Sequence, residues 1–177
     1  MTTGLIYRFL LVAMMLPNLL AAEQQPVKYH DGKPDGHKSL GGSGEIIVFE
    51  APSDACALKA IRIHGSRYGF PEAPDENFYI FVTGADAKGI LHTETAPYER
   101  FERGNAKWVE VKFKNPPKLP PKFCVILDFR AQQTKGVYVS FDTSSGGKHS
   151  WTGLPDKEPS PVDFGADWMV EAVLEKP

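Results

Sequence analysis

The chain has 177 residues, of which 42% are hydrophobic and 24% charged, and its formal net charge at pH 7 is −2. This length fits one domain that can bury a core of its own. The near-neutral charge, without a dense stripe of basic residues, argues against nucleic acid as a partner, because phosphate binding requires clustered cations.

The first 22 residues have the order of a secretory signal peptide. Arg8 supplies a positive charge, residues 9–20 form a short apolar run broken by Pro17, and two small residues, Ala21 and Ala22, follow. The run is too short for a membrane-spanning helix, which needs about 20 apolar residues. We predict cleavage after Ala22, which removes 22 of 177 residues and leaves 155. The alternative is a retained anchor or a lipoprotein, but no cysteine or polybasic flank lies near the cleavage site. We therefore expect a secreted or periplasmic protein with no stable membrane anchor.

Residues 23–44 are polar and glycine-rich, and they predict a lead segment that enters the domain edge as a tail. A β-sandwich domain is predicted over residues 45–177. Short runs there are rich in Val, Ile, Phe, Tyr and Trp and are separated by Gly, Pro, Asn and Asp, which is typical of strands. The predicted strands are 45–49, 58–64, 78–83, 90–93, 107–113, 123–129, 137–142 and 168–174.

Several of these runs alternate between apolar and polar residues. Ile61 and Ile63 alternate with Arg62 and His64, and the run 137–142 behaves in the same way. Such alternation is typical of antiparallel sheets with one face on the core and one in water. Residues 78–82 are apolar on both faces and predict a central strand covered twice. The proline-rich residues 115–121 predict a connection, since proline removes ladder donors. The fold class is thus all-β, a single antiparallel sandwich.

Two cysteines, Cys56 and Cys124, can pair only with each other. An exported protein permits a disulfide between them, and we predict one. Two buried thiols are the alternative, because free cysteine is commonly buried.

Seven short runs spread over the sequence form a distinctive set: 29–32 (YHDG), 42–44 (GSG), 61–69 (IRIHGSRYG), 101–104 (FERG), 107–109 (KWV), 133–140 (QTKGVYVS) and 167–170 (DWMV). In these runs the sequence resembles a group of uncharacterised secreted bacterial β-sandwich domains. The resemblance implies a jelly-roll-like accessory module of a carbohydrate-binding type. Similar domains open with two acids after the tyrosine, whereas His30 takes the first acid's place here, which argues against a cation site at that end.

Signatures of catalysis and of cofactor binding are missing from the sequence. It has no Gly-x-Ser-x-Gly, His-Glu-x-x-His or Cys-x-x-Cys motif, and its glycine-rich run 41–44 precedes a strand rather than a helix. No two histidines have the local spacing of a zinc site. His30, Asp31, Asp35 and His37 lie close together, but two carboxylates are too few for a calcium cage of 6–8 oxygens. We therefore predict no catalytic residue, no metal site and no cofactor.

Polar and aromatic residues gather at the predicted strand ends and in the loops beyond them. This mixture suits sugars, because planar donors and acceptors meet hydroxyl groups while an aromatic face covers a ring. The residues that we predict to bind a ligand are His64, Arg67, Tyr68, Arg130, Asp142 and Trp151. The alternative is that they form cross-strand charge pairs and cover an open end of the sandwich.

Three hypotheses for function remain open at this point. The first is a non-catalytic binding or accessory module with a carbohydrate or an extracytoplasmic protein as partner. The second is a small secreted hydrolase with its site in loops 65–74 and 144–161, since loops on rigid β scaffolds carry function. The third is a structural envelope protein. The missing catalytic motifs favour the first.

Overall fold

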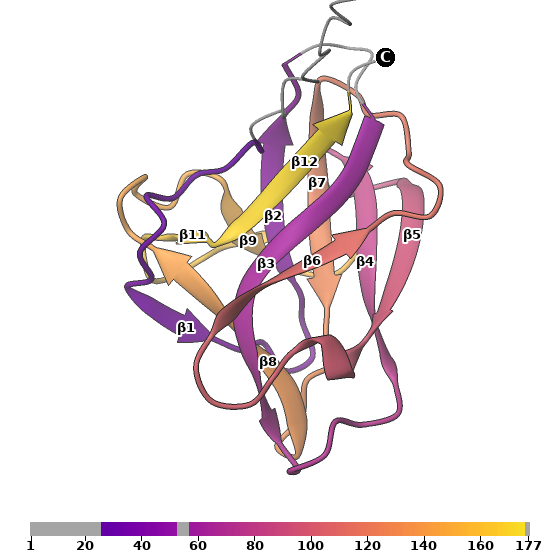
Figure 1. The fold of residues 1–177 in the computed structure, drawn as a ribbon. Coiled ribbons are helices and arrows are strands. Elements are labelled where there is room, and N and C mark those ends of the chain that lie inside the picture. The colour runs from indigo at the N-terminus through magenta and orange to yellow at the C-terminus, as the bar shows by residue number, and fades with distance from the viewer. Residues whose placement is uncertain (1–25, 53–56, 176–177) are drawn as a thin grey trace, which may run out of the picture.

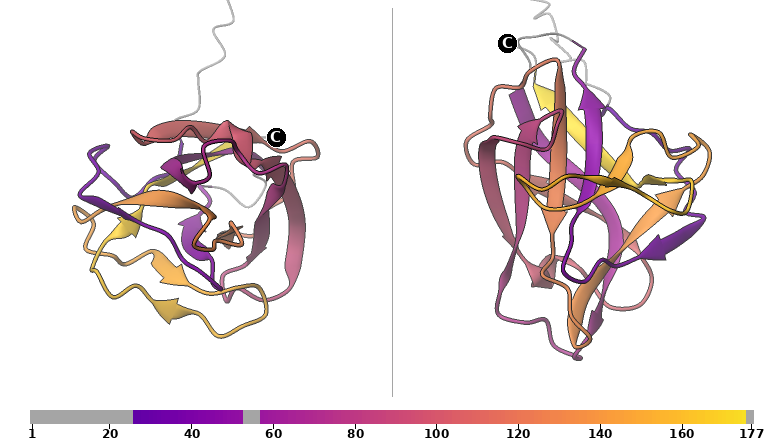
Figure 2. Two further views of the ribbon diagram at one scale, coloured as in Figure 1. Left: turned by 90° about the horizontal axis from the view of Figure 1, so that it is seen from below. Right: turned by 180° about the vertical axis from the view of Figure 1, so that it is seen from behind.

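The computed structural model describes residues 26–52 and 57–175. They form two antiparallel six-stranded sheets packed face to face, with one short 3₁₀ helix, Tyr98–Arg100 (Figure 1). The left view of Figure 2 shows the sandwich from below, and the right view shows it from behind. The predicted all-β sandwich is confirmed. Within the described residues, no helix is long and apolar enough to cross a membrane.

The first sheet has the order β1-β8-β3-β12, with β6 on the other side of β3 and β11 beside β8. The second sheet has the order β10-β9-β2-β7-β4-β5. The strands are β1 Gly36–Lys38, β2 Glu45–Glu50, β3 Ala57–Gly69, β4 Asn77–Gly84, β5 Ile90–Pro97, β6 Lys107–Lys112, β7 Lys122–Asp128, β8 Lys135–Asp142, β9 Ser150–Thr152, β10 Ser160–Pro161, β11 Asp167–Trp168 and β12 Val170–Glu175.

The first eight strands have the topology of a jelly roll. Strand β1 pairs with β8, β2 with β7, β3 with β6 and β4 with β5. This nested pairing is that of one long folded ribbon wrapped into two sheets. Cross-pairing of β3 with β8 and of β4 with β7 completes each layer. The last strand, β12, then extends the first sheet along β3.

The core lies between the sheets and follows the predicted alternation. Ile61 and Ile63 of β3 and Val125 and Leu127 of β7 are fully buried in one cluster. The residues between them on the same strands face outward, so each sheet also has an outer surface. Ile46, Cys124 and Ile126 form a second, smaller cluster on the outer surface of the second sheet.

The lead segment is part of the domain, which corrects its interpretation as a tail. Gly36–Lys38 pairs with β8, and Val27 forms a bridge with Ala172 of β12. Tyr29 packs against the core, and its hydroxyl accepts the Glu50 N–H at 3.2 Å, which ties the lead segment to β2 of the second sheet. His30 is only 8% exposed. The segment is polar in composition, but its few apolar and aromatic side chains all find partners.

Residues 78–82 lie within a central strand, as predicted, but only one of its faces is fully covered. Phe78, Ile80 and Val82 are buried, whereas Tyr79 and Phe81 on the outer face are partly exposed. The proline-rich residues 115–121 connect β6 to β7 and form no strand. Within this segment, Lys118 forms an isolated antiparallel β-bridge with Ala57.

Candidate pocket on the outer face of the second sheet

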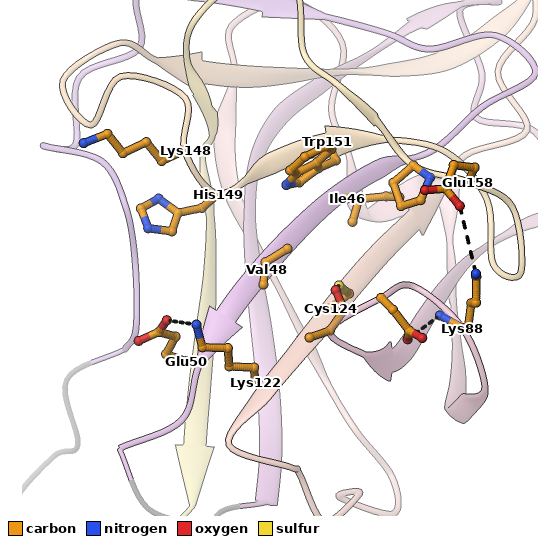
Figure 3. A pocket seen from close by; sticks show the side chains of 13 residues that line it. Ile46, Val48, Glu50, Lys88, Lys122, Cys124, Lys148, His149, Trp151 and Glu158 are labelled. Atoms are coloured by element: carbon orange, nitrogen blue, oxygen red, sulfur yellow. Dashed lines mark hydrogen bonds and ion pairs between the residues drawn. The ribbon is translucent and has the colours of Figure 1, made fainter.

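A pocket of about 520 Å³ lies on the outer surface of the second sheet, over β2, β7 and β9 (Figure 3). This volume is in the range of small-molecule sites. Its lining combines apolar side chains with three lysines and three carboxylates: Ile46, Val48, Glu50, Ala85, Asp86, Lys88, Lys122, Cys124, Lys148, His149, Trp151, Glu158 and Pro159.

The floor of the pocket is apolar because alternate residues of β2 and β7 face outward. Ile46 and Val48 alternate with the core residues Ile47 and Phe49, and Val48 lies opposite Cys124. Figure 3 shows Val48 and Cys124 in the middle of the pocket, between its charged ends. The floor therefore offers a ligand an apolar surface to pack against.

Trp151 stands beside this floor on the short strand β9. It lies opposite Ile46 in the ladder and packs against the outer cluster. Its backbone is fixed from the core side, where the Trp168 indole N–H donates to the Trp151 carbonyl oxygen at 3.2 Å and the Trp168 N–H donates to Ser150 Oγ at 2.8 Å. The strand that carries the indole is thus held by hydrogen bonds to the buried Trp168.

Two ion pairs close the ends of the pocket. Lys122 Nζ lies 2.7 Å from Glu50 Oε1 at one end, and Lys88 Nζ lies 4.0 Å from Glu158 Oε2 at the other (Figure 3). The hydrogen bond from Lys122 lowers the pKa of Glu50 and in turn raises the pKa of Lys122. Lys148 forms no ion pair with any described residue. The other two lysines of the rim, Lys88 and Lys122, are each compensated by a carboxylate.

His149, on the rim of the pocket, is held by two contacts with its ring. Its ring stacks on Tyr29 at a centroid distance of 3.5 Å, and its Nδ1 lies 3.1 Å from the carboxylate of the buried Asp167. Ser145 donates to the same carboxylate. Asp167 thus separates the serine from the imidazole instead of orienting the imidazole toward it, so these three residues do not form a nucleophilic triad.

Cys124 is a free, buried thiol whose Sγ donates to the Ala85 carbonyl oxygen at 3.5 Å. Burial raises the pKa of this thiol, which is the opposite of what an activated nucleophile needs. No disulfide is found among the described residues, and Cys56 lies outside them. The predicted Cys56–Cys124 bridge thus finds no support in the structure.

The six residues predicted to bind a ligand lie in three different places. Trp151 lines the pocket. His64, Tyr68 and Asp142 lie on the outer side of the first sheet, where the His64 Nδ1 is 2.9 Å from Ser140 Oγ and the Tyr68 hydroxyl donates to the Gln132 carbonyl oxygen at 2.9 Å.

Asp142 is buried and serves as an anchor for backbone. It accepts the N–H groups of Ser144 at 2.7 Å and of Asp31 at 3.3 Å. Burial raises the pKa of Asp142, but hydrogen bonds from Ser144 and Asp31 outweigh it and leave the pKa below its usual value. This carboxylate therefore holds the lead segment against β8.

The side chains of Arg67 and Arg130 make contacts within the protein that stabilise the fold. Arg67 donates to the carbonyl oxygens of Phe70 and Pro71 in the turn after β3. Arg130 pairs with Glu76 at 3.1 Å and lies over the Tyr79 ring. The structure therefore does not bring the six residues together at one place, and their role in binding stays a prediction.

Most of the pocket lining was missed from sequence. One signal was available, because Ile46 to Val48 are apolar at consecutive positions and such a strand exposes apolar groups on its outer face. The charged rim has no comparable signal, since its residues come from separate loops. Within residues 26–52 and 57–175, no group of three or more His, Cys, Asp or Glu side chains is placed to hold a metal ion.

Comparison with solved structures supports the fold. The chain is similar to a crystal structure of the cysteine protease and lectin-like domains of Cwp84, a surface layer associated protein of Clostridium difficile, with a TM-score of 0.52 and 11% identity. The match covers 78% of this chain and 33% of that one, so this chain spans about a third of its length. At this identity the likeness shows the fold alone. No protein-family model and no curated protein matches the sequence.

Proposed function

We propose that this protein is a non-catalytic binding module that acts outside the cytoplasm and holds a short carbohydrate in the pocket of Figure 3. The observation that carries the proposal is Trp151 beside an apolar floor, with hydrogen-bonding groups at both ends of the pocket. Sugars present an apolar ring face and a rim of hydroxyl groups, and this lining complements both.

The charge balance of the pocket favours sugars over strongly charged ligands. Glu50 and Glu158 are each paired with a lysine, so these groups offer donors and acceptors without a large net field. The likeness to a structure that includes a lectin-like domain supports a binding role at the level of fold. The hydrolase hypothesis is weaker, because the thiol and the imidazole that line the pocket are both engaged elsewhere.

Titration calorimetry with di- and trisaccharides released from bacterial and plant cell walls tests the proposal. Trp151→Ala removes the aromatic wall and is expected to weaken binding by about 2 kcal/mol, or about 30-fold in Kd, as for an anchor residue. Trp151→Phe keeps a ring and is expected to retain part of the affinity. Unfolding midpoints of both variants separate lost binding from lost structure.

The matched control is Phe70→Ala, which removes an aromatic ring that is 63% exposed and lies outside the pocket. It is expected to bind as the unaltered protein does. Equal binding by Trp151→Ala and the unaltered protein would show that the pocket is not the site. Hydrolysis of any of these sugars, or of a simple ester, would contradict the non-catalytic role.

A further inference from the structure

The outer face of the first sheet carries two exposed aromatic side chains that the core does not use. Trp108 of β6 is 40% exposed and Tyr138 of β8 is 37% exposed. Both point away from the core, because their neighbours Val111 on β6 and Val137 and Val139 on β8 are buried inside the sandwich. Large exposed aromatic groups on the outer face of a sheet are a typical feature of recognition surfaces.

Each of these rings is held in place by two further rings. Trp108 lies 5.3 Å from the His30 ring and 5.0 Å from the His64 ring. Tyr138 lies 4.5 Å from Tyr68 and 4.9 Å from His37. Rings fixed before binding lose little conformational entropy when a ligand stacks on them.

The charges on this face are compensated within the protein. Arg62 lies between two carboxylates, with its Nε 2.9 Å from Glu110 and its Nη1 3.6 Å from Glu171. Lys107 pairs with Glu102. Between the two exposed rings lie uncharged polar groups, among them Ser140 and the His64 ring, which hydrogen-bond each other. The surface therefore complements a neutral polar ligand rather than an acidic or basic one.

The strand register sets the distance between the two rings. Trp108 lies opposite His64 on one side of β3, and Tyr138 lies opposite Ser66 on the other side. Two strand spacings amount to about 10 Å, and two residues along β3 to about 7 Å. A ligand that stacks on both rings must therefore be extended and larger than one sugar ring.

We propose that this face, with Trp108 and Tyr138 at its centre, is a second binding surface for an extended neutral polysaccharide whose separate sugar units stack on the two rings. It shares with the proposed function only the class of ligand, because it lies on the opposite side of the sandwich from the pocket. The structural alternative is that the rings only cover the sheet.

The test is binding of long-chain xylan, soluble cellulose derivatives and β-1,3-glucan, measured by affinity electrophoresis in a Trp151→Ala background so that the pocket does not contribute. Trp108→Ala and Tyr138→Ala are each expected to weaken binding at least tenfold, and the double variant at least a hundredfold. Affinity is expected to rise with chain length up to the span of both rings. Trp108→Phe is expected to retain binding, and Phe70→Ala is the matched control.

Unchanged binding by both alanine variants, with unfolding midpoints also unchanged, would overturn this second surface. If Trp108→Ala does not fold, Tyr138→Ala decides alone. In a background that keeps Trp151, Trp108→Ala and Tyr138→Ala are expected to leave the binding of disaccharides by the pocket as it was. Loss of disaccharide binding in Trp151→Ala, together with polysaccharide binding that Trp108→Ala and Tyr138→Ala leave unchanged, would support the pocket and reject this surface. Loss of polysaccharide binding in Trp108→Ala and Tyr138→Ala, together with disaccharide binding that Trp151→Ala leaves unchanged, would do the opposite. Binding of no saccharide at all rejects both.

Discussion

Glu45, at the start of β2, is a carboxyl group with almost no exposure to solvent. It is 1% exposed, and its Oε1 finds no hydrogen-bond partner among the described residues. Burial raises the pKa of Glu45 well above its usual value, because an ionised carboxylate is poorly solvated inside the protein. The folded state therefore keeps a proton that the unfolded chain releases near pH 4.3.

This difference gives a pH dependence with a definite sign. Since the folded state binds more protons above about pH 4.3, stability falls as pH rises through that range. Glu45→Gln keeps the shape and cannot ionise, so it is expected to raise the free energy of unfolding at pH 8 and to lose this advantage toward pH 4. Urea denaturation at pH 4, 6 and 8 measures it. Glu72→Gln, which alters an exposed carboxyl group outside the ion pairs of the described residues, is the control. An effect of Glu45→Gln that is equal at all three pH values would contradict the prediction.

The lead segment, residues 26–44, makes packing contacts and hydrogen bonds that its polar composition does not suggest. Tyr29 stacks on His149 and packs against Phe49, and its hydroxyl accepts the Glu50 N–H. It thereby ties the lead segment to β2 and supports His149 in the wall of the pocket.

Tyr29→Ala is accordingly expected to lower the free energy of unfolding by about 3 kcal/mol, as for loss of a packed aromatic side chain. Tyr29→Phe loses only the hydrogen bond, for which we expect about 1 kcal/mol. Chemical denaturation measures both, with the exposed neighbour Lys28→Ala as control. A change below about 0.5 kcal/mol in Tyr29→Ala would mean that the segment is the tail that its composition suggested.

The elements that sequence predicts are those with local apolar patterns. All eight predicted strands are present, but the short strands β1, β9 and β10 were missed, because their two or three residues become strand only through pairing with β8, β2 and β9. Strand β3 runs five residues past the predicted end at His64, since Gly65 to Gly69 pair with β8. At Gly65 a side chain would meet the Tyr138 carbonyl oxygen at 2.6 Å, which explains the glycine there.

The candidate site was predictable only in part, for a related reason. Alternation correctly placed His64 on the outer face of its strand, and composition identified Trp151 as a binding residue candidate. Which sheet each strand joins depends on pairing between distant segments, and the alternation pattern is the same in either sheet. Residues from both outer faces and from one end were therefore grouped as a single site.

At the scale of the whole molecule, export remains a prediction from residues that the structure does not describe. Expression with the native N-terminus in a bacterial host is expected to yield protein that begins near Glu23 in the envelope or the medium. N-terminal sequencing checks this. Soluble cytoplasmic protein that keeps Met1 would contradict it.

The two proposed surfaces lie on opposite outer faces of a sandwich whose sheets are about 10 Å apart, and Trp108 and Trp151 share no contact partner in either aromatic or core clusters. Substitutions at sites that far apart, without common contact partners, usually have free-energy effects that add within about 0.5 kcal/mol.

We therefore expect titration with a neutral hexasaccharide to show two sites. Trp151→Ala is expected to weaken one site about 30-fold and Trp108→Ala the other at least tenfold, each leaving the Kd of the unaltered site within about twofold. The double variant is expected to weaken both. A single variant that removes both sites at once, while the unfolding midpoint is unchanged, would mean that one ligand engages both faces or that the faces are coupled through the core.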